Sequence, residues 1–365
     1  MSRVVYLHVG APRTGTSYLH RRLAANRETL AQHGVHVPAG SGQHLAALDL
    51  LERREGPEDT QGQWDALVRA TQRVDGTALI SQDALATASP EQVRRALDSF
   101  GDADVHVVYV ARDLARQIPT EWQESLKRGR SWSYARYLDR VRRRRGQASR
   151  HFWRAQDVGD VLSRWSAGLA PENVHVVVAP AGDPSLEQRW ELYCAAFRID
   201  PSWAPAEAEQ VPPPLSIAEA GTLRALNRRL REHPEDDPAE RRAVIRAALA
   251  GRRGAHPEED PGAAVHEPIT LRPDLSAWAA GITEEWVDWI TGSGVHVVGD
   301  VHDLWPPMPD TDVAWSDPDH SDRRAMASAA LDLLAQMTLE ASRRTPADEQ
   351  LGAFGRAARL LRGTG

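Results

Sequence analysis

The fold is decided near the N-terminus by the stretch Val4-Val5-Tyr6-Leu7-His8-Val9-Gly10-Ala11-Pro12-Arg13-Thr14-Gly15-Thr16-Ser17. A largely apolar run from Val4 to Val9 stops at Gly10, and after Gly15 the sequence becomes helical in pattern. This order predicts a buried strand, a tight loop (residues 10–15, called here the glycine loop) and the start of a helix. The spacing Gly10-x-x-x-x-Gly15 is that of a phosphate-binding loop, whose backbone N–H groups and following helix N-terminus bind phosphate oxygens.

The glycine loop differs from that of an ATP-hydrolysing protein at one position. Such a protein has lysine where this chain has Thr16, and here the basic side chain, Arg13, comes three residues earlier, inside the loop. A cation at this position would lie beside a bound 5′-phosphate, where charge builds up on a bridging oxygen as a terminal group leaves. A glycine-rich turn also serves as a plain connection between a strand and a helix, so a second motif is needed.

The second motif follows another predicted strand, the run Val105–Val110. The segment from Arg112 to Glu124 is predicted to be one helix, kinked at Pro119. With a period of 3.6 residues, one side of this helix carries the polar side chains Arg112, Arg116, Thr120, Gln123 and Lys127. This stripe predicts an anion-binding face, although a plain surface helix with arginine–carboxylate pairs worth about 0.2–1 kcal/mol each has the same pattern.

The two motifs together resemble the family of sulfotransferases that use 3′-phosphoadenosine-5′-phosphosulfate (PAPS), and in particular its bacterial members. The resemblance covers residues 4–130 and fades beyond them. It implies that the 5′-phosphosulfate is bound by Pro12, Arg13, Thr14, Gly15, Thr16 and Ser17. It further implies that Arg112 and the hydroxyl residue eight positions later, Thr120, bind the 3′-phosphate. The family usually has serine at the second position, so Thr120 is a departure that keeps the hydroxyl.

Lys127 is also predicted to bind the cofactor. It is the single lysine among 44 lysines and arginines, and the compact ammonium of lysine differs from a guanidinium in geometry and hydration. The resemblance implies PAPS as the cofactor, adenosine 3′,5′-bisphosphate (PAP) as its product, an in-line displacement, and no requirement for a metal.

Three residues are predicted to be catalytic. Arg13 is expected to stabilise the leaving oxygen. For the base that accepts the proton of the acceptor, two candidates stay open. His44 has a suitable unperturbed pKa of about 6.5, and Asp83 follows a predicted strand at its carboxyl end. The family has His or Glu in this role. Each residue also has a purely structural interpretation, as a cap of the helix or turn at which it lies.

Valine-rich strands separated by helical segments predict a parallel sheet covered on both faces. The predicted fold class is therefore α/β, a three-layer fold of the P-loop type with a largely helical C-terminal part. We expect a sulfotransferase domain over residues 1–310, with a PAPS-binding core at 1–200, a helical acceptor-side region at 205–292 and the last strand near 295–298. Residues 311–365 are expected to form an acidic loop and helices, the last of them over 348–361.

Some residues are given structural rather than functional interpretations. His8, His106, His175 and His296 lie within predicted strands and are interpreted as core or edge residues with satisfied hydrogen bonds. The run Arg142–Arg145 is interpreted as a solvated loop. The alternative is that, with Phe152 and Trp153, it closes over the nucleotide or an anionic acceptor. Cys194 is interpreted as a core residue, and no spacing of Cys or His resembles a zinc site.

The composition limits the function classes. A net charge of −7 argues against a general nucleic-acid binder, and no stretch approaches the 18 apolar residues of a membrane span. Because a strand is predicted at Val4, we expect no signal peptide, and a single cysteine fits a reducing cytoplasm. The expected partners are a small-molecule acceptor (a carbohydrate, phenol or natural product) and possibly a second copy of the chain. Two alternatives remain: an ATP-dependent phosphotransferase, which should have lysine at position 16, and a non-catalytic PAP-binding protein, which should lack a base.

Overall fold

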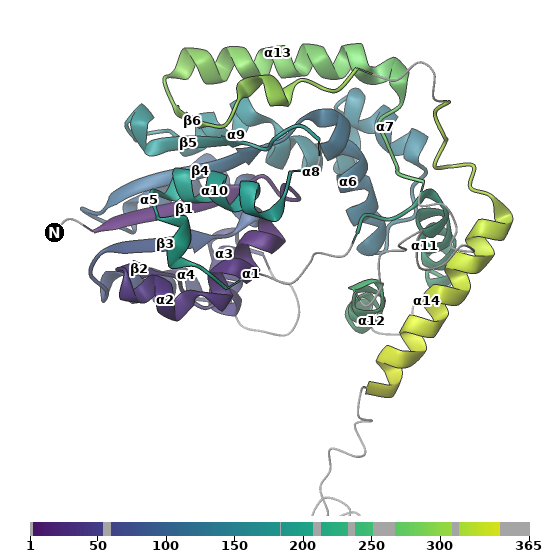
Figure 1. Ribbon diagram of the computed structural model, residues 1–365, viewed down its shortest axis with the longest axis horizontal. Helices are drawn as coiled ribbons and strands as arrows, with labels where there is room; N and C mark the ends of the chain where they lie inside the picture. Colours follow the sequence, from purple (N-terminus) through teal and green to yellow (C-terminus); the bar gives the residue numbers. More distant parts are fainter. Residues whose placement is uncertain are drawn as a thin grey trace, which may run out of the picture. The chain divides into compact units, whose positions relative to one another are not determined.

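The computed structural model describes residues 3–53, 60–182, 184–206, 213–232, 238–250, 267–308 and 314–343. One parallel sheet forms the centre of the fold, with helices on both of its faces (Figure 1). The predicted α/β class is thus confirmed. The predicted helix over 348–361 lies outside the described residues.

The sheet has six strands in the order β2-β3-β1-β4-β5-β6, and every neighbouring pair is parallel. The strands are β1 (Val4–Gly10), β2 (Val35–His36), β3 (Thr77–Ser81), β4 (Asp104–Ala111), β5 (Val174–Val178) and β6 (His296–Val298). After β1 the chain forms the edge strand β2 and then β3, which lies between β2 and β1, and from β4 onward it adds strands on the other side of β1. In such sheets, ligands bind at the carboxyl ends of the strands where the order reverses. Here that place lies between β1 and β4.

Helices follow most of the strands, as the apolar periodicity predicts. The α-helices are α1 (Thr16–Ala25), α2 (Arg27–Gln32), α3 (Gly40–Leu50), α4 (Gln63–Gln72), α5 (Pro90–Asp98), α6 (Leu114–Lys127), α7 (Tyr134–Arg142), α8 (Gly146–Gln156), α9 (Val158–Trp165), α10 (Leu186–Phe197), α11 (Ile217–Leu230), α12 (Pro238–Ala250), α13 (Ser276–Ser293) and α14 (Arg323–Arg343). A short 3₁₀ helix, η1 (Asp83–Thr87), follows β3. Helix α6 begins two residues after Arg112 and continues through Pro119.

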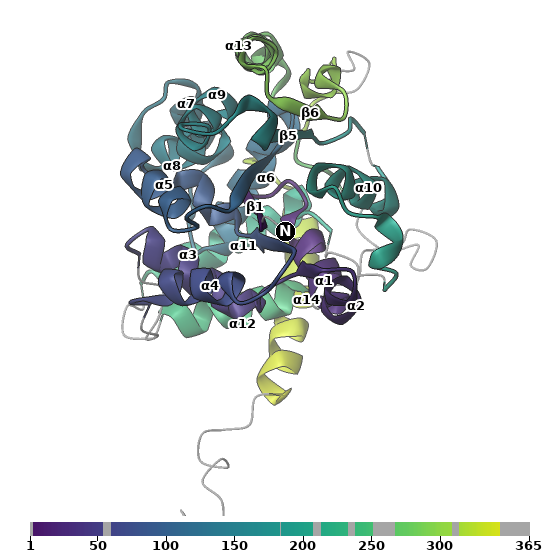
Figure 2. The same cartoon turned by 90° about the vertical axis from the view of Figure 1, so that its left-hand side faces the viewer.

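Side chains along β1 alternate between the two faces of the sheet and therefore pack in two different cores. Tyr6 and His8 face α1 and α10, where their rings meet Phe197 and Tyr193 at centroid distances of 5.9 and 6.0 Å. Helices α1, α2 and α10 lie on this side of the sheet, and α3, α4, α5, α8 and α9 lie on the other (Figure 2). Because both faces are covered, the central strands are buried and read as nearly continuous apolar runs.

The chain divides into two compact units. The first comprises residues 1–123, 132–211 and 269–316, and the second comprises 124–131, 212–268 and 317–365. Both units are discontinuous in sequence, unlike the contiguous domains drawn from the sequence, and the division falls within α6. The sheet and the glycine loop belong to the first unit.

A ladder of histidines crosses three strands of the sheet. His106 Nδ1 lies 2.9 Å from His175 Nε2, and His175 Nδ1 lies 2.9 Å from His296 Nδ1. At the other end, His106 Nε2 lies 3.2 Å from a carboxylate oxygen of Asp104. Since the carboxylate can only accept, His106 donates from Nε2, so His175 donates from Nε2 and His296 from Nδ1. The interpretation as satisfied core or edge residues is confirmed for His106, His175 and His296. For His8 it holds only in part, because its Nε2 is buried without a hydrogen-bond partner among the described residues.

This ladder predicts a loss of stability in acid. Burial lowers the pKa of His106 and lowers that of His175 to about 3, whereas the unfolded chain binds these protons near pH 6.5. The contribution of these two histidines to the free energy of unfolding is therefore complete above about pH 6.5. It declines as the pH falls toward the folded-state pKa, by at most about 1.4 kcal/mol per pH unit for each group. We expect denaturant titrations from pH 7 to pH 4 to show this slope, and His175→Gln to reduce it. The exposed control His302→Gln should leave the slope unchanged, and an equal slope in all three proteins would contradict the prediction.

Candidate functional site

The backbone of the glycine loop departs from ordinary strand and helix geometry at three residues. Gly10 and Gly15 have φ angles of +148° and +104°. A Cβ on Gly10 would lie 2.8 Å from the Cβ of Ala86 in η1, so only glycine fits between β1 and η1. Arg13 has a φ of +69°, in the left-handed region that is uncommon for residues other than glycine. Backbone strain of this kind clusters at functional sites.

The carbonyl groups of the glycine loop are held by side chains. Three successive carbonyls each accept such a bond: Ala11 O from Thr14 Oγ1 (2.8 Å), Pro12 O from Gln117 Nε2 (2.7 Å) and Gln156 Nε2 (3.1 Å), and Arg13 O from Arg112 Nη1 (3.4 Å). The carbonyl dipoles are thereby turned toward the protein. Two of these donors, Gln117 and Gln156, were not predicted from the sequence.

The backbone N–H groups at the end of the loop and the start of α1 differ from these carbonyl groups. In the part of the chain that the structure describes, the backbone N–H groups of Thr14, Gly15, Thr16 and Ser17 have no acceptor. They come at the N-terminus of α1, where the helix dipole favours negative charge. A run of open N–H groups at a helix start is suited to binding a phosphate or sulfate group.

Arg112 brings a cation to this loop from the neighbouring strand. It follows β4 directly, as predicted, and β4 pairs with β1. Burial lowers the pKa of Arg112 to about 10, with a smaller effect of Arg116, so the side chain remains charged at neutral pH. The side chain of Arg116 instead pairs with Asp113. It also donates hydrogen bonds to the carbonyls of Pro180 and Gly182 at 2.8 and 2.9 Å.

Two other predicted cofactor-binding residues lie further along α6. The hydroxyl of Thr120 donates to the carbonyl of Arg116 at 2.8 Å and so caps a turn of its own helix. Lys127 is the last residue of α6 and belongs to the second unit. Their roles in cofactor binding stay predictions.

Of the two candidate bases, Asp83 contacts Thr16, the residue that directly follows the glycine loop. It is the first residue of η1, and its Oδ2 accepts a hydrogen bond of 2.9 Å from Thr16 Oγ1. Its Oδ1 accepts no bond within the described ranges. His44 is an exposed residue of α3. The residue of α3 that reaches the end of β3 is instead Gln43, which accepts a 2.7 Å bond from the N–H of Ser81.

A cluster of polar side chains lies at Ser81, the last residue of β3, two positions before Asp83. Its centre is Ser81 Oγ, which lies 2.7 Å from His8 Nδ1 and 2.8 Å from His20 Nε2. Burial lowers the pKa of His20 and lowers that of His8 to about 3. Both rings are therefore neutral at pH 7, and the cluster fixes the end of β3 without adding charge. No local pattern predicts this cluster, because His8 and Ser81 are 73 positions apart along the chain.

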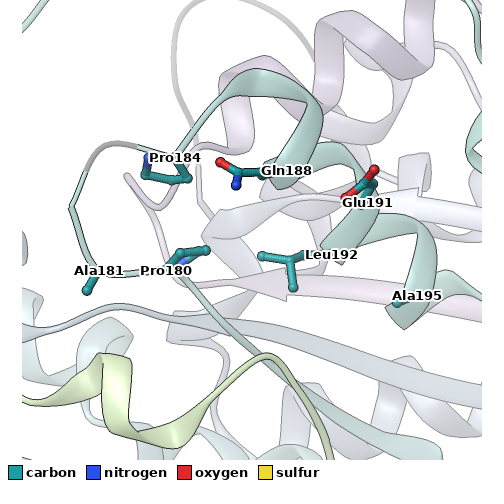
Figure 3. A pocket seen from close by; sticks show the side chains of 7 residues that line it. All are labelled: Pro180, Ala181, Pro184, Gln188, Glu191, Leu192 and Ala195. Atoms are coloured by element: carbon teal, nitrogen blue, oxygen red, sulfur yellow. The ribbon is translucent and has the colours of Figure 1, made fainter.

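A shallow hollow of about 580 Å³ lies beside α10 (Figure 3). It is lined by Pro180, Ala181, Pro184, Gln188, Glu191, Leu192 and Ala195. The lining contains one carboxylate and no basic side chain, which is unsuitable for a phosphate. The glycine loop therefore remains the candidate anion site.

Comparison of the chain with protein-family models, curated proteins and solved structures finds no match. Within the described residues, no group of three or more His, Cys, Asp or Glu side chains is arranged to hold a metal ion. No helix in the same ranges is both long and apolar enough to cross a membrane. The glycine loop and the side chains around it are therefore the features from which a function can be inferred.

Proposed function

We propose that the protein is a sulfotransferase that moves a sulfuryl group from PAPS to a hydroxyl or amine acceptor and releases PAP. The observation that carries the proposal is the polarity of the glycine loop: its carbonyls are held by side chains, its following N–H groups are open, and its basic residue is Arg13 inside the loop. Position 16, where an ATP-dependent loop has lysine, is threonine.

The binding part of the proposal concerns the two phosphates of the nucleotide. The N–H groups of residues 14–17 would bind the 5′-phosphate, and Arg112, held at the end of the neighbouring strand, would bind the 3′-phosphate. PAPS supplies the activated sulfuryl group. Arg13 would stabilise negative charge on the oxygen that bridges sulfur and the 5′-phosphate as that bond breaks.

The catalytic part of the proposal concerns Asp83. Its Oδ2 is held by Thr16, so Oδ1 is the atom that would accept the proton of the acceptor. As the acceptor oxygen or nitrogen forms its bond to sulfur, the bond from sulfur to the bridging oxygen breaks, and the electron pair of that bond leaves with PAP. The acceptor class we expect is a carbohydrate, a phenol or a natural product. Such a reaction and the single buried cysteine, Cys194, fit a reducing cytoplasm.

One observation favours a second candidate, an ATP-dependent phosphotransferase. A loop hydroxyl beside a strand-end carboxylate, as in the Thr16–Asp83 pair, is also the arrangement that holds Mg²⁺ in phosphoryl-transfer enzymes. Against this candidate stands the absence of lysine at position 16. A non-catalytic PAP-binding protein needs no base, so the open oxygen of Asp83 argues against it.

Calorimetry with PAP in EDTA tests the proposal. We expect a dissociation constant in the low-micromolar range or below without metal, because two anion sites each form charge-assisted hydrogen bonds. AMP, which lacks the 3′-phosphate, should bind more weakly. Equal affinities for PAP and AMP would mean that Arg112 and Thr120 do not bind the 3′-phosphate. Binding of ATP with Mg²⁺ in place of PAP would favour the phosphotransferase. Turnover can then be measured by mass spectrometry of PAP release across a panel of acceptors.

A further inference from the structure

Helix α10 reaches the glycine loop through two side chains that the sequence did not single out. A Cβ built on Gly15 would lie 3.6 Å from the hydroxyl oxygen of Tyr193 and 3.9 Å from Nη1 of Arg189. These two residues are four positions apart and therefore lie on one face of the helix. The turn at Gly15 thus has α10 as its neighbour, next to the open N–H groups of the loop.

The hydroxyl of Tyr193 is buried without a partner. The side chain is 3% exposed, and its oxygen has no hydrogen bond in the described part of the chain. The ring itself is well packed, stacked on Phe197 and edge-on to His8. A phenylalanine would fill the same space without leaving a buried polar atom unsatisfied, which is disfavoured. The hydroxyl is therefore suited to a ligand that arrives at the loop.

Arg189 adds positive charge at the same place. Its Nε donates to the carbonyl of Pro184 at 3.2 Å, which fixes the direction of the guanidinium. Burial is the main cause of the lowered pKa of Arg112, and the positive charges of Arg116 and Arg189 lower this pKa further. Asp113 opposes this effect, but it is already paired with Arg116. Cations gathered in this way repel one another, and a multiply charged anion would relieve that repulsion.

We propose that Arg189 and Tyr193 of α10 are nucleotide-binding residues that contact the phosphate held by the glycine loop. The proposal rests on the proposed function, in that the loop holds the 5′-phosphate of a nucleotide. Arg189 supplies a charged donor and Tyr193 a neutral donor. Two groups on one rigid helix thereby complete a site that the loop and Arg112 form from the β1–β4 side.

The first test is Arg189→Gln, studied by calorimetry with AMP and PAP. Both nucleotides carry a 5′-phosphate, so both should bind about 10-fold more weakly or worse, the usual effect of losing a charged hydrogen bond. The matched control is Arg198→Asn at the other end of α10. It removes the same charge, and its φ of +53° is one that asparagine tolerates. The control should bind both nucleotides as the wild type does.

The second test is Tyr193→Phe, which separates binding from folding. The ring is kept, and an unpartnered hydroxyl is removed, so the thermal midpoint of the ligand-free protein should stay the same or rise. Affinity for AMP and PAP should nevertheless fall several-fold. A purely structural role for the hydroxyl would give the reverse result: a lower midpoint and unchanged affinity.

The outcomes distinguish this inference from the proposed function. Tight binding of PAP by the wild type, with unchanged affinities in Arg189→Gln and Tyr193→Phe, would overturn the inference and leave the proposed function standing. Preference of the wild type for ATP with Mg²⁺, weakened by the same two substitutions, would overturn the proposed function and support the inference. Failure of the wild type to bind AMP, PAP or ATP would overturn both.

Discussion

We expect the replacement of Asp83 by Asn to lower the rate of PAP release by about 10²–10⁴-fold, the usual effect of losing a general base. The affinity for PAP should change little, because the substitution keeps the size of the side chain and its hydrogen bond with Thr16. The amide cannot accept a proton from the acceptor at the position of Oδ1, so the loss falls on turnover rather than on binding. Steady-state kinetics and calorimetry on the same preparation measure the two quantities.

His44→Ala is the control for this experiment, since His44 is the other base candidate and is exposed on α3. We expect His44→Ala to keep near-normal turnover. If both single variants lose turnover and the double variant loses little more, the two residues act together as a base and its orienting partner. If Asp83→Asn keeps normal turnover, Asp83 is not the base, and the Thr16–Asp83 pair is only a structural contact.

The fold was predictable because its central strands are buried on both faces. Val4–Val9 and Val105–Val110 read as continuous apolar runs, and helical periodicity between such runs leaves few topologies other than a parallel sheet. The helices α7, α8 and α9 were not predicted. In this region Arg144 lies over the ring of Trp153 at 4.3 Å and pairs with Asp157 at 3.2 Å. Arg144 is thus held by contacts with Trp153 of α8 and with Asp157, which no local pattern reveals.

The candidate site was predictable only where it is local in sequence or follows from strand pairing. The glycine loop is contiguous, and Arg112 could be named because it directly follows a predicted strand of the parallel sheet. The donors to the carbonyl of Pro12 could not be foreseen, since Gln156 is 144 positions away along the chain. The same holds for the contact of α10 with Gly15, which depends on where the helix crosses the sheet. Composition and periodicity report burial, whereas these contacts depend on the three-dimensional path of the chain.

Arg13 provides the second large expected effect. Its φ of +69° is unfavourable for a side chain with a Cβ, and Arg112 donates to its carbonyl oxygen. This backbone conformation keeps the Arg13 residue inside the loop, where its guanidinium would meet the bridging oxygen. The charge on that oxygen grows as the sulfuryl group leaves, so the interaction is stronger in the transition state than in the bound ground state.

Replacing Arg13 by Ala should therefore lower turnover by about 10²–10³-fold, as for the loss of an oxyanion-type donor, while PAP affinity falls less. Arg13→Lys is the matched control, because lysine and alanine experience the same backbone strain and lysine restores a charge. We expect it to recover part of the lost turnover but not all, since an ammonium lacks the planar fork of a guanidinium. Both variants are compared by the rate of PAP release at saturating PAPS and by calorimetry with PAP. A loss of affinity with unchanged turnover in Arg13→Ala would make Arg13 an anchor for the bound nucleotide. In that case, charge stabilisation at the bridging oxygen would have to come from another cation at the 5′-phosphate, such as Arg189.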